Sequence, residues 1–112
     1  MKKLLILLPA IMLLAACGAK NLKSGAEVVR ILPVAPQANQ CKYLGDITGK
    51  QTGAIQHTAN TVARGAMNDL KNKTYKMGGN AVYILNSNAS GGLLGVEPSH
   101  SVTGIAYNCT SF

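Results

Sequence analysis

The chain has 112 residues, enough for one domain, and it carries 11 Lys and Arg against 4 Asp and Glu, a formal net charge of +7. Hydrophobic residues make up 47% of the chain, and 13 of them fall in residues 1–16. The remaining residues are about 42% hydrophobic, which is ordinary for a globular domain. These figures exclude a multidomain enzyme, a multispanning membrane protein and a disordered acidic tail.

The first sixteen residues have the pattern of a bacterial signal peptide. Two lysines follow the initiator methionine, and an apolar stretch of 11 residues runs from Leu4 to Leu14, shorter than the ~20 residues that a bilayer span needs. Small residues then precede Cys17 in an arrangement that resembles a lipobox. In that class the cysteine thiol receives a diacylglyceryl group, and the new N-terminus is acylated after cleavage. We expect residues 1–16 to be removed and Cys17 to carry the lipid; an ordinary secretory signal is the alternative.

Residues 17–26 contain few apolar residues and no periodic pattern, which predicts a short flexible tether after the lipidated cysteine. Its mean reach is under ~20 Å, so the domain is expected close to the membrane surface. Gly18, and not Asp, follows the cysteine, and by analogy with enteric bacteria this favours the outer membrane over the inner one. Lys20 and Lys23 lie at that surface, where they are either simply solvated or weakly attracted to anionic head groups.

Residues 27–112 are predicted to form a single α+β domain. β-rich runs predict strands at residues 27–32 and 41–49, joined by an extended connection that contains Pro33 and Pro36. In the second strand, alternation places Cys41, Tyr43 and Ile47 on one face, with Gly45 between them. Gly45 and Gly49 indicate either a close approach of another backbone or a β-bulge.

The apolar period changes to that of a helix between His57 or Thr58 and Met77. The apolar stripe consists of Ala59, Val62, Ala63, Ala66, Met67, Leu70 and Met77. Thr58 or Asn60 is the expected N-cap, and Gly78 is the expected glycine after the C-terminal end.

A third strand is predicted at residues 79–86, a long loop at 87–98, and a last strand at 100–109. The loop contains the apolar residues Leu93, Leu94 and Val96, which either fold back on the core or form a small contact patch. The order β-β-α-β-β predicts a small four-stranded, mostly antiparallel sheet with one helix packed on one face.

Two cysteines remain once Cys17 is lipidated, and an even remainder in an exported chain predicts one disulfide, Cys41–Cys109. It would close a loop of about 68 residues and stabilise the fold by ~4 kcal/mol on the chain-entropy model. Cys41 begins one strand and Cys109 ends another, so antiparallel pairing brings them together, whereas parallel pairing separates them by ~25 Å. The same pairing sets Tyr43 opposite Tyr107, and it sets Gly45 opposite Ile105.

No catalytic pattern is recognisable. The acids, which form no obvious acid–base pair, are Glu27, Asp46, Asp69 and Glu97. The chain contains no nucleophile elbow and no phosphate-binding loop. Free thiols that bind a metal with His57 or His100 are the weaker alternative to the disulfide, because there is no CxxC. The lysines near the end of the helix are interpreted as a solvated face and not as a nucleic-acid-binding patch, because an exported protein is not in contact with the chromosome.

Several motifs in combination resemble a family of small enterobacterial-type lipoproteins classed as a domain of unknown function. They are Cys41-x-x-x-Gly45-x-x-x-Gly49-Lys50-Gln51, Arg64-Gly65-Ala66-x-Asn68-Asp69-Leu70-Lys71-Asn72, Met77-Gly78-Gly79-Asn80, and the last strand ending on Cys109. The resemblance covers residues 28–109 and implies a location and a fold but no catalytic residue.

A more distant resemblance is to the outer-membrane sensor lipoproteins of the Rcs envelope-stress phosphorelay. It rests on Leu44-Gly45-Asp46-Ile47-Thr48-Gly49, on Lys76-Met77 at the end of the helix, and on Asn80-Ala81-Val82. The chain departs from those sensors because it lacks a long proline-rich stalk and has two domain cysteines where the sensors have four. The resemblance implies a shared fold rather than a shared signalling role.

Three polar residues are carried forward as a candidate recognition surface: Asn68, Asp69 and Asn80. Asn68, Asp69 and Asn72 lie at helical spacing as neighbours on one helix face. The plainer reading is that these side chains bond to solvent or to the backbone of a neighbouring loop.

The leading hypothesis is a non-enzymatic lipoprotein in the outer membrane of a Gram-negative bacterium, facing the periplasm. It would be a binding or envelope-maintenance module whose partner is an envelope protein or the cell wall. A stress sensor that signals to an inner-membrane partner is the alternative, which a reach under ~20 Å disfavours. We expect a monomer with no metal, no nucleic-acid partner and no cofactor besides the lipid on Cys17.

Overall fold

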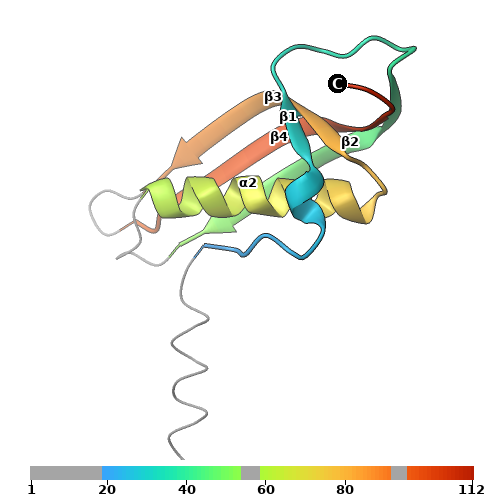
Figure 1. Ribbon diagram of the computed structural model, residues 1–112. Helices are drawn as coiled ribbons and strands as arrows, with labels where there is room; N and C mark the ends of the chain where they lie inside the picture. The colour runs from blue at the N-terminus through green and yellow to red at the C-terminus, as the bar shows by residue number, and fades with distance from the viewer. Residues whose placement is uncertain (1–18, 54–58, 92–95) are drawn as a thin grey trace, which may run out of the picture.

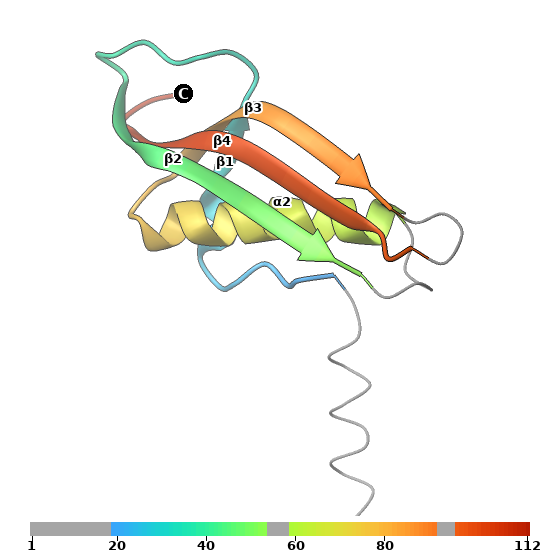
Figure 2. The same ribbon diagram turned by 180° about the vertical axis from the view of Figure 1, so that it is seen from behind.

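The computed structural model describes residues 19–53, 59–91 and 96–112. It has two layers, a four-stranded sheet and one long helix that lies against one face of the sheet (Figure 1). Seen from behind, the other face of the sheet is open (Figure 2). The main elements are β1 (Arg30–Leu32), β2 (Cys41–Thr52), α2 (Ala59–Lys76), β3 (Ala81–Ser90) and β4 (Ser99–Cys109).

The strand order in the sheet is β1-β3-β4-β2. β1 pairs in parallel with β3, whereas β3 with β4 and β2 with β4 are antiparallel pairs. The predicted α+β class, the β-β-α-β-β order and the mostly antiparallel sheet are therefore confirmed.

The strand predicted at residues 27–32 is wrong in its first half. Ala26–Val28 form a short 3-10 turn, η1, and β1 begins only at Arg30. The Glu27 carboxylate accepts a hydrogen bond from the Gly25 amide (2.8 Å), which stabilises the turn locally. This local bonding outweighs the β propensity of the two valines in the segment.

The loop predicted at residues 87–98 is wrong in its first part, because β3 continues to Ser90. The antiparallel ladder with β4 extends to the pair Ser90 and Ser99, whose hydroxyl oxygens lie 2.6 Å apart. Pairing with a neighbouring strand thus overrides the weak β propensity of this Ser- and Asn-rich stretch. Leu93 and Leu94 lie outside the described residues, and Val96 is exposed.

The helix α2 ends at Lys76, one residue before the predicted end. Its apolar stripe is shorter than predicted, because Met77 lies past the helix and is 41% exposed. Val62, Ala66 and Leu70 repeat every four residues and are at most 1% exposed. Ala66 and Leu70 pack with residues of the strands in the main core cluster. Thr74 continues the stripe, and its buried hydroxyl donates to the Leu70 carbonyl oxygen (2.9 Å).

The two ends of α2 can be compared with the predicted caps. Thr58 lies outside the described residues, and Asn60 lies inside the helix and is not its N-cap. Gly78 has a φ of +85°, as expected for the glycine after a helix end. Its amide donates to the Tyr75 carbonyl oxygen (2.9 Å), and the next amide donates to that of Thr74 (2.9 Å). This Schellman arrangement satisfies carbonyls that the helix leaves unpaired.

β2 and β4 pair in the predicted register at the disulfide end. Cys41 lies opposite Cys109, and Tyr43 lies opposite Tyr107. Directly afterwards the register shifts by one residue at Leu44, which forms a β-bulge. A bulge inserts one residue and reverses the alternation of the side chains that follow it.

The bulge makes two predictions wrong. Gly45 lies opposite Ala106, and not opposite Ile105. Ile47 belongs to the core under α2, whereas Tyr43 is on the open face, so the two residues do not share a face. A bulge was one of the two expectations for Gly45, but which residue is inserted and how the alternation then changes depend on pairing with a distant strand.

Gly49 allows α2 to lie unusually close to β2. A Cβ atom at this position would collide with the Ala66 carbonyl oxygen and would stand 2.6 Å from the Leu70 amide nitrogen. The sequence predicted either a close backbone approach or a bulge at Gly45 and Gly49. The close approach is confirmed at Gly49, and Gly45 directly follows the bulge at Leu44.

Candidate functional site

The N-terminal segment, residues 19–25, runs along the flank of α2 (Figure 1). Asn72 holds it with two hydrogen bonds, one donated to the Asn21 carbonyl oxygen (2.9 Å) and one accepted from the Lys23 amide (2.8 Å). Gly25 has a φ of +96° and no side chain, so the ring of Tyr75 lies against its backbone. The segment is therefore bound to the domain along its length.

Lys20 is held in the same way, one helix turn earlier. Asn68 donates to the Lys20 carbonyl oxygen (2.8 Å), and the Lys20 amide donates to the Gln51 side-chain oxygen (2.9 Å). Asn68 and Asn72 are four residues apart, which places both side chains on one side of the helix. Residues 19–25 thus do not form the flexible tether that was expected over residues 17–26.

Asp69 lies at the centre of this arrangement and is only 9% exposed. Its carboxylate accepts a hydrogen bond from the Lys50 amide (2.9 Å) and pairs with the ammonium groups of Lys73 (3.1 Å) and Lys20 (3.4 Å). Lys73 also donates to the Thr48 carbonyl oxygen (2.7 Å). Asp69 and Lys73 thereby provide hydrogen-bond partners for the Lys50 amide and the Thr48 carbonyl on the outer side of the edge strand β2. Unpaired backbone groups on an edge strand can pair with a strand of another chain.

The electrostatics of Asp69 follow from these partners. Burial alone would raise the pKa of its carboxyl, but the hydrogen bond from the Lys50 amide and the charges of Lys73 and Lys20 outweigh burial. The pKa of Asp69 is therefore lowered from its ordinary value, and the group is ionised at neutral pH.

A surface groove of about 1220 Å³ opens between the N-terminal segment and the second half of α2. Four lysines line it, together with one carboxylate, and the lining also contains the glycines after the helix. The charged lining residues are Lys20, Lys23, Lys73, Lys76 and Asp69. We call this the basic groove, because its four positive charges exceed its one negative charge.

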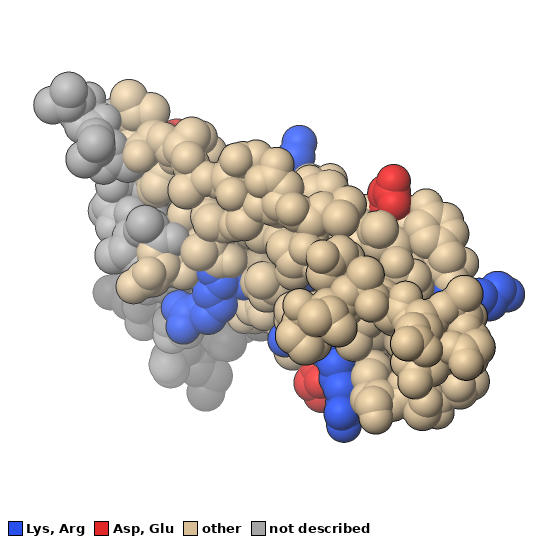
Figure 3. Space-filling model, turned by 90° about the horizontal axis from the view of Figure 1, so that it is seen from above, with Lys and Arg blue, Asp and Glu red and all other residues tan. Residues whose placement is uncertain are grey.

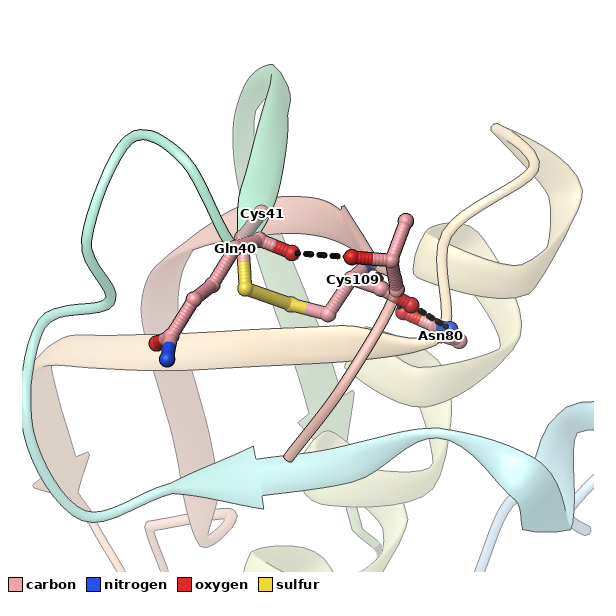
Figure 4. The surroundings of a disulfide bond; sticks show 5 residues. Gln40, Cys41, Asn80 and Cys109 are labelled. Atoms are coloured by element: carbon pink, nitrogen blue, oxygen red, sulfur yellow. Dashed lines mark hydrogen bonds between the residues drawn. A yellow bond between two sulfur atoms is a disulfide. The ribbon is translucent and has the colours of Figure 1, made fainter.

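Asn80 also lines the basic groove, and it is hydrogen-bonded to Cys109 in β4 (Figure 4). Its side chain donates to the Cys109 carbonyl oxygen (2.8 Å) and accepts from the Cys109 amide (2.7 Å). Cys41 and Cys109 form the predicted disulfide, with their Cα atoms 3.9 Å apart. Thr110 extends the pairing through its amide, which donates to the Gln40 carbonyl oxygen (3.0 Å).

The open face of the sheet carries tyrosines beside the disulfide. The rings of Tyr43 and Tyr107 meet edge to face, with centroids 6.3 Å apart. The Tyr43 hydroxyl donates to the Asp46 carboxylate (3.1 Å), and this hydrogen bond raises the pKa of Tyr43. Asp46 and Tyr43 are both exposed, which leaves their pair in contact with solvent.

No three His, Cys, Asp or Glu side chains in residues 19–53, 59–91 and 96–112 gather where they could hold a metal ion. In the same part of the chain, no helix has the length and apolar character that crossing a bilayer requires.

The structure brings some of the predicted site residues together. Asn68 and Asp69 lie side by side at the N-terminal segment, and Asn80 lies at the other end of the basic groove. Asn68 bonds to a neighbouring segment's backbone, as the simpler interpretation predicted, whereas Asp69 also pairs with two lysines and Asn80 bonds to the backbone of β4. Recognition by these residues stays a prediction. Cys17 lies outside the described residues.

Sequence reasoning missed other members of the site. Gln51, Lys73 and the role of Asn72 toward the N-terminal segment were not predicted. The spacing of Asn68 and Asn72 was the one available signal, because two asparagines four residues apart on a helix have the geometry to bind an extended backbone.

Comparisons with known proteins give one matching family and several relatives. Residues 20–109 match the family described as Domain of unknown function (DUF4156). The chain is also similar to the "Uncharacterized protein YjeI" of Escherichia coli (strain K12), with 37% identity over 105 residues that cover 89% of each chain. The protein of the same name in Shigella flexneri shows the same identity and coverage. This chain therefore belongs to the DUF4156 family, a family of unknown function.

Proposed function

We propose that this protein is a lipoprotein of the outer membrane that faces the periplasm and acts there as a non-enzymatic binding or envelope-maintenance module. The sequence argument is the lipobox that ends at Cys17, preceded by a signal-peptide pattern. The lipid on that cysteine would be the membrane anchor, and two or three acyl chains hold a protein far more firmly than one.

The observation that carries the proposal is the binding of the N-terminal segment to the domain. Ala19 lies two residues after Cys17, so their Cα atoms are at most about 7 Å apart. From Lys20 onward the chain is hydrogen-bonded to α2 and β2. A lipid on Cys17 would thus hold the folded domain directly at the membrane surface, as suits a module that works at the envelope.

The same geometry disfavours the alternative of a sensor that signals to an inner-membrane partner. A bound N-terminal segment gives the domain even less reach than a free tether of under ~20 Å. The likeness to the Rcs sensor lipoproteins stays a prediction about fold.

The anchor is tested by expressing the full chain in a Gram-negative host with labelled palmitate and by separating the two membranes on a density gradient. We expect the wild-type protein to carry the label and to sediment with the outer membrane. Cys17→Ser should lose the label and yield either unprocessed precursor or soluble periplasmic protein, because the thiol is the site of lipid attachment.

Gly18→Asp is the matched control. It should keep the label, because Cys17 is intact, and should move to the inner membrane if the residue after the cysteine sets the destination. A Cys17→Ser protein that still sediments with the outer membrane at mature mass would contradict the proposal.

A further inference from the structure

The basic groove has an excess of positive charge that the protein itself does not neutralise. Asp69 pairs with Lys20 and Lys73, whose side chains remain 49% exposed. Among the described residues, Lys23 and Lys76 form no ion pair. The groove therefore presents a net charge of about +3 to solvent, and its complement is an anionic surface or ligand.

The groove also lies next to the predicted anchor. Lys20 is three residues from Cys17, so their Cα atoms are at most about 11 Å apart. In Figures 1 and 2 the N-terminal segment lies along the lower side of the molecule. On the opposite side, seen from above in Figure 3, Lys and Arg side chains stand singly among uncharged and acidic residues. The four lysines of the basic groove thus lie together beside the N-terminal segment, on the side where the chain would enter the membrane.

We propose that the basic groove rests on the phosphate head groups of anionic phospholipids in the membrane that holds the anchor. This inference rests on the proposed lipid attachment at Cys17. The attraction comes from the lysine side chains and not from the helix, because the C-terminal end of α2 carries a partial negative charge. The contact would fix the orientation of the domain, with the N-terminal segment toward the membrane. Tyr43 and Tyr107, beside the disulfide, lie on the open face of the sheet.

The test is lysine footprinting of the purified full-length lipoprotein in vesicles. The protein is incorporated either into pure phosphatidylcholine or into an equal mixture of phosphatidylcholine and phosphatidylglycerol, neither of which contains an amine. Reductive methylation is then followed by peptide mass spectrometry. In anionic vesicles we expect the groove lysines to react about fivefold more slowly than in zwitterionic ones, the factor that a lysine near an anionic surface contributes. In 0.5 M salt the difference should disappear because of screening.

Lys50 is the internal control. Its side chain is exposed and alternates with Gly49, which faces α2, so it belongs to the other face of the sheet. It should react at the same rate in both vesicles. Equal rates for the groove lysines in the two vesicles, or equal slowing of Lys50, would overturn the proposal.

Charge reversal provides the second arm. The double variant Lys23→Glu with Lys76→Glu should fold normally, because neither side chain forms an ion pair among the described residues. In anionic vesicles, Lys20 and Lys73 of this variant should react as fast as they do in phosphatidylcholine. Lys50→Glu, the matched variant, should leave their protection intact. Full protection in the double variant would contradict the inference.

Two outcomes separate the possible failures. Incorporation into pure phosphatidylcholine depends on the lipid anchor alone, so a chain that does not incorporate there refutes the anchor and not the groove. Inorganic phosphate at 10 mM is added to the phosphatidylcholine sample. Protection of the groove lysines by phosphate in that sample would identify a site for a soluble anion and overturn the assignment to the membrane.

Discussion

At the scale of single residues, Asp69 is the carboxylate with the most partners among the described residues of the site. It lies between the edge of β2 and the N-terminal segment, with an amide and two ammonium groups as partners. Its lowered pKa is explained by the hydrogen bond from the Lys50 amide and by the charges of Lys73 and Lys20, which outweigh the effect of burial. A perturbed carboxylate therefore marks a structural junction in this protein, a reading that its place at a strand edge supports.

Asp69→Asn should destabilise the fold by about 1–3 kcal/mol at pH 7, because charge-assisted hydrogen bonds are lost at a nearly buried position. The pKa of Asp69 is lowered in the folded protein, so its contribution is fully present above the unfolded-state pKa of ~3.9 and is lost as the pH falls through the folded-state pKa. Urea unfolding of the wild type and the variant, at pH 7 and at decreasing pH below 4, should show the difference narrowing.

Asp46→Asn is the control for this experiment, since Asp46 is exposed and bonds to the equally exposed Tyr43. It should change the free energy of unfolding by less than about 0.5 kcal/mol. A difference between wild type and Asp69→Asn that stays constant down to pH 2 would show that the carboxylate charge is not the cause.

At the scale of elements, the pairing of the N-terminal segment with α2 is the feature that links the fold to the proposed anchor. An extended backbone cannot leave its amides and carbonyls unpaired against a protein surface without cost. Asn68, Asn72 and Gln51 supply the missing partners from two different elements. One side of α2 therefore packs in the core, and another side hydrogen-bonds to the N-terminal segment.

Asn68→Ala with Asn72→Ala should release the segment without unfolding the domain. Three hydrogen bonds to residues 19–25 are lost, whereas the buried stripe of α2 is untouched. Hydrogen exchange read by mass spectrometry should become at least tenfold faster in a peptide covering residues 19–25, equivalent to about 1.4 kcal/mol or more of lost protection. Peptides from β4 should exchange as in the wild type.

The matched variant for this test is Asn88→Ala, which removes an exposed asparagine from β3, remote from the segment. It should leave the exchange of residues 19–25 unchanged. Unaltered protection of the segment in the double variant would mean that the asparagine hydrogen bonds do not hold it.

At the scale of the whole molecule, the disulfide joins the ends of the two strands that make the longest ladder in the sheet. Cys41 and Cys109 are 68 residues apart in sequence and lie directly opposite each other in β2 and β4. Together with Ala81 they form a small buried cluster, separate from the main core under α2. The bridge therefore stabilises the end of the sheet that α2 does not cover.

Replacing both cysteines, as Cys41→Ala with Cys109→Ala, should lower the thermal midpoint by about 10 °C, because a bridge over such a loop contributes a few kcal/mol and a domain this small loses ~4–8 °C per kcal/mol. Calorimetry measures the midpoint. Dithiothreitol should lower the midpoint of the wild type and leave that of the double variant unchanged. Non-reducing peptide mapping that finds two free thiols in exported protein would contradict the bridge.

The sequence by itself determined the order of the elements, the boundaries of α2 and the cysteine pair. These features depend on local periodicity, on a glycine after a helix end, and on the small number of cysteines, all of which are visible in one chain. The β-bulge at Leu44 and the parallel pairing of β1 with β3 were decided only by the tertiary structure, because register is a property of two strands.

The candidate site divides in the same way. Asn68 and Asp69 could be chosen from the sequence because each lies at helical spacing from Asn72, four and three residues away. Their partners could not, since Lys20 and Asn68 are 48 residues apart and no periodicity connects them. An irregular segment such as residues 19–25 has no pattern of its own, and its position is determined by the side chains of the folded domain that pair with its backbone.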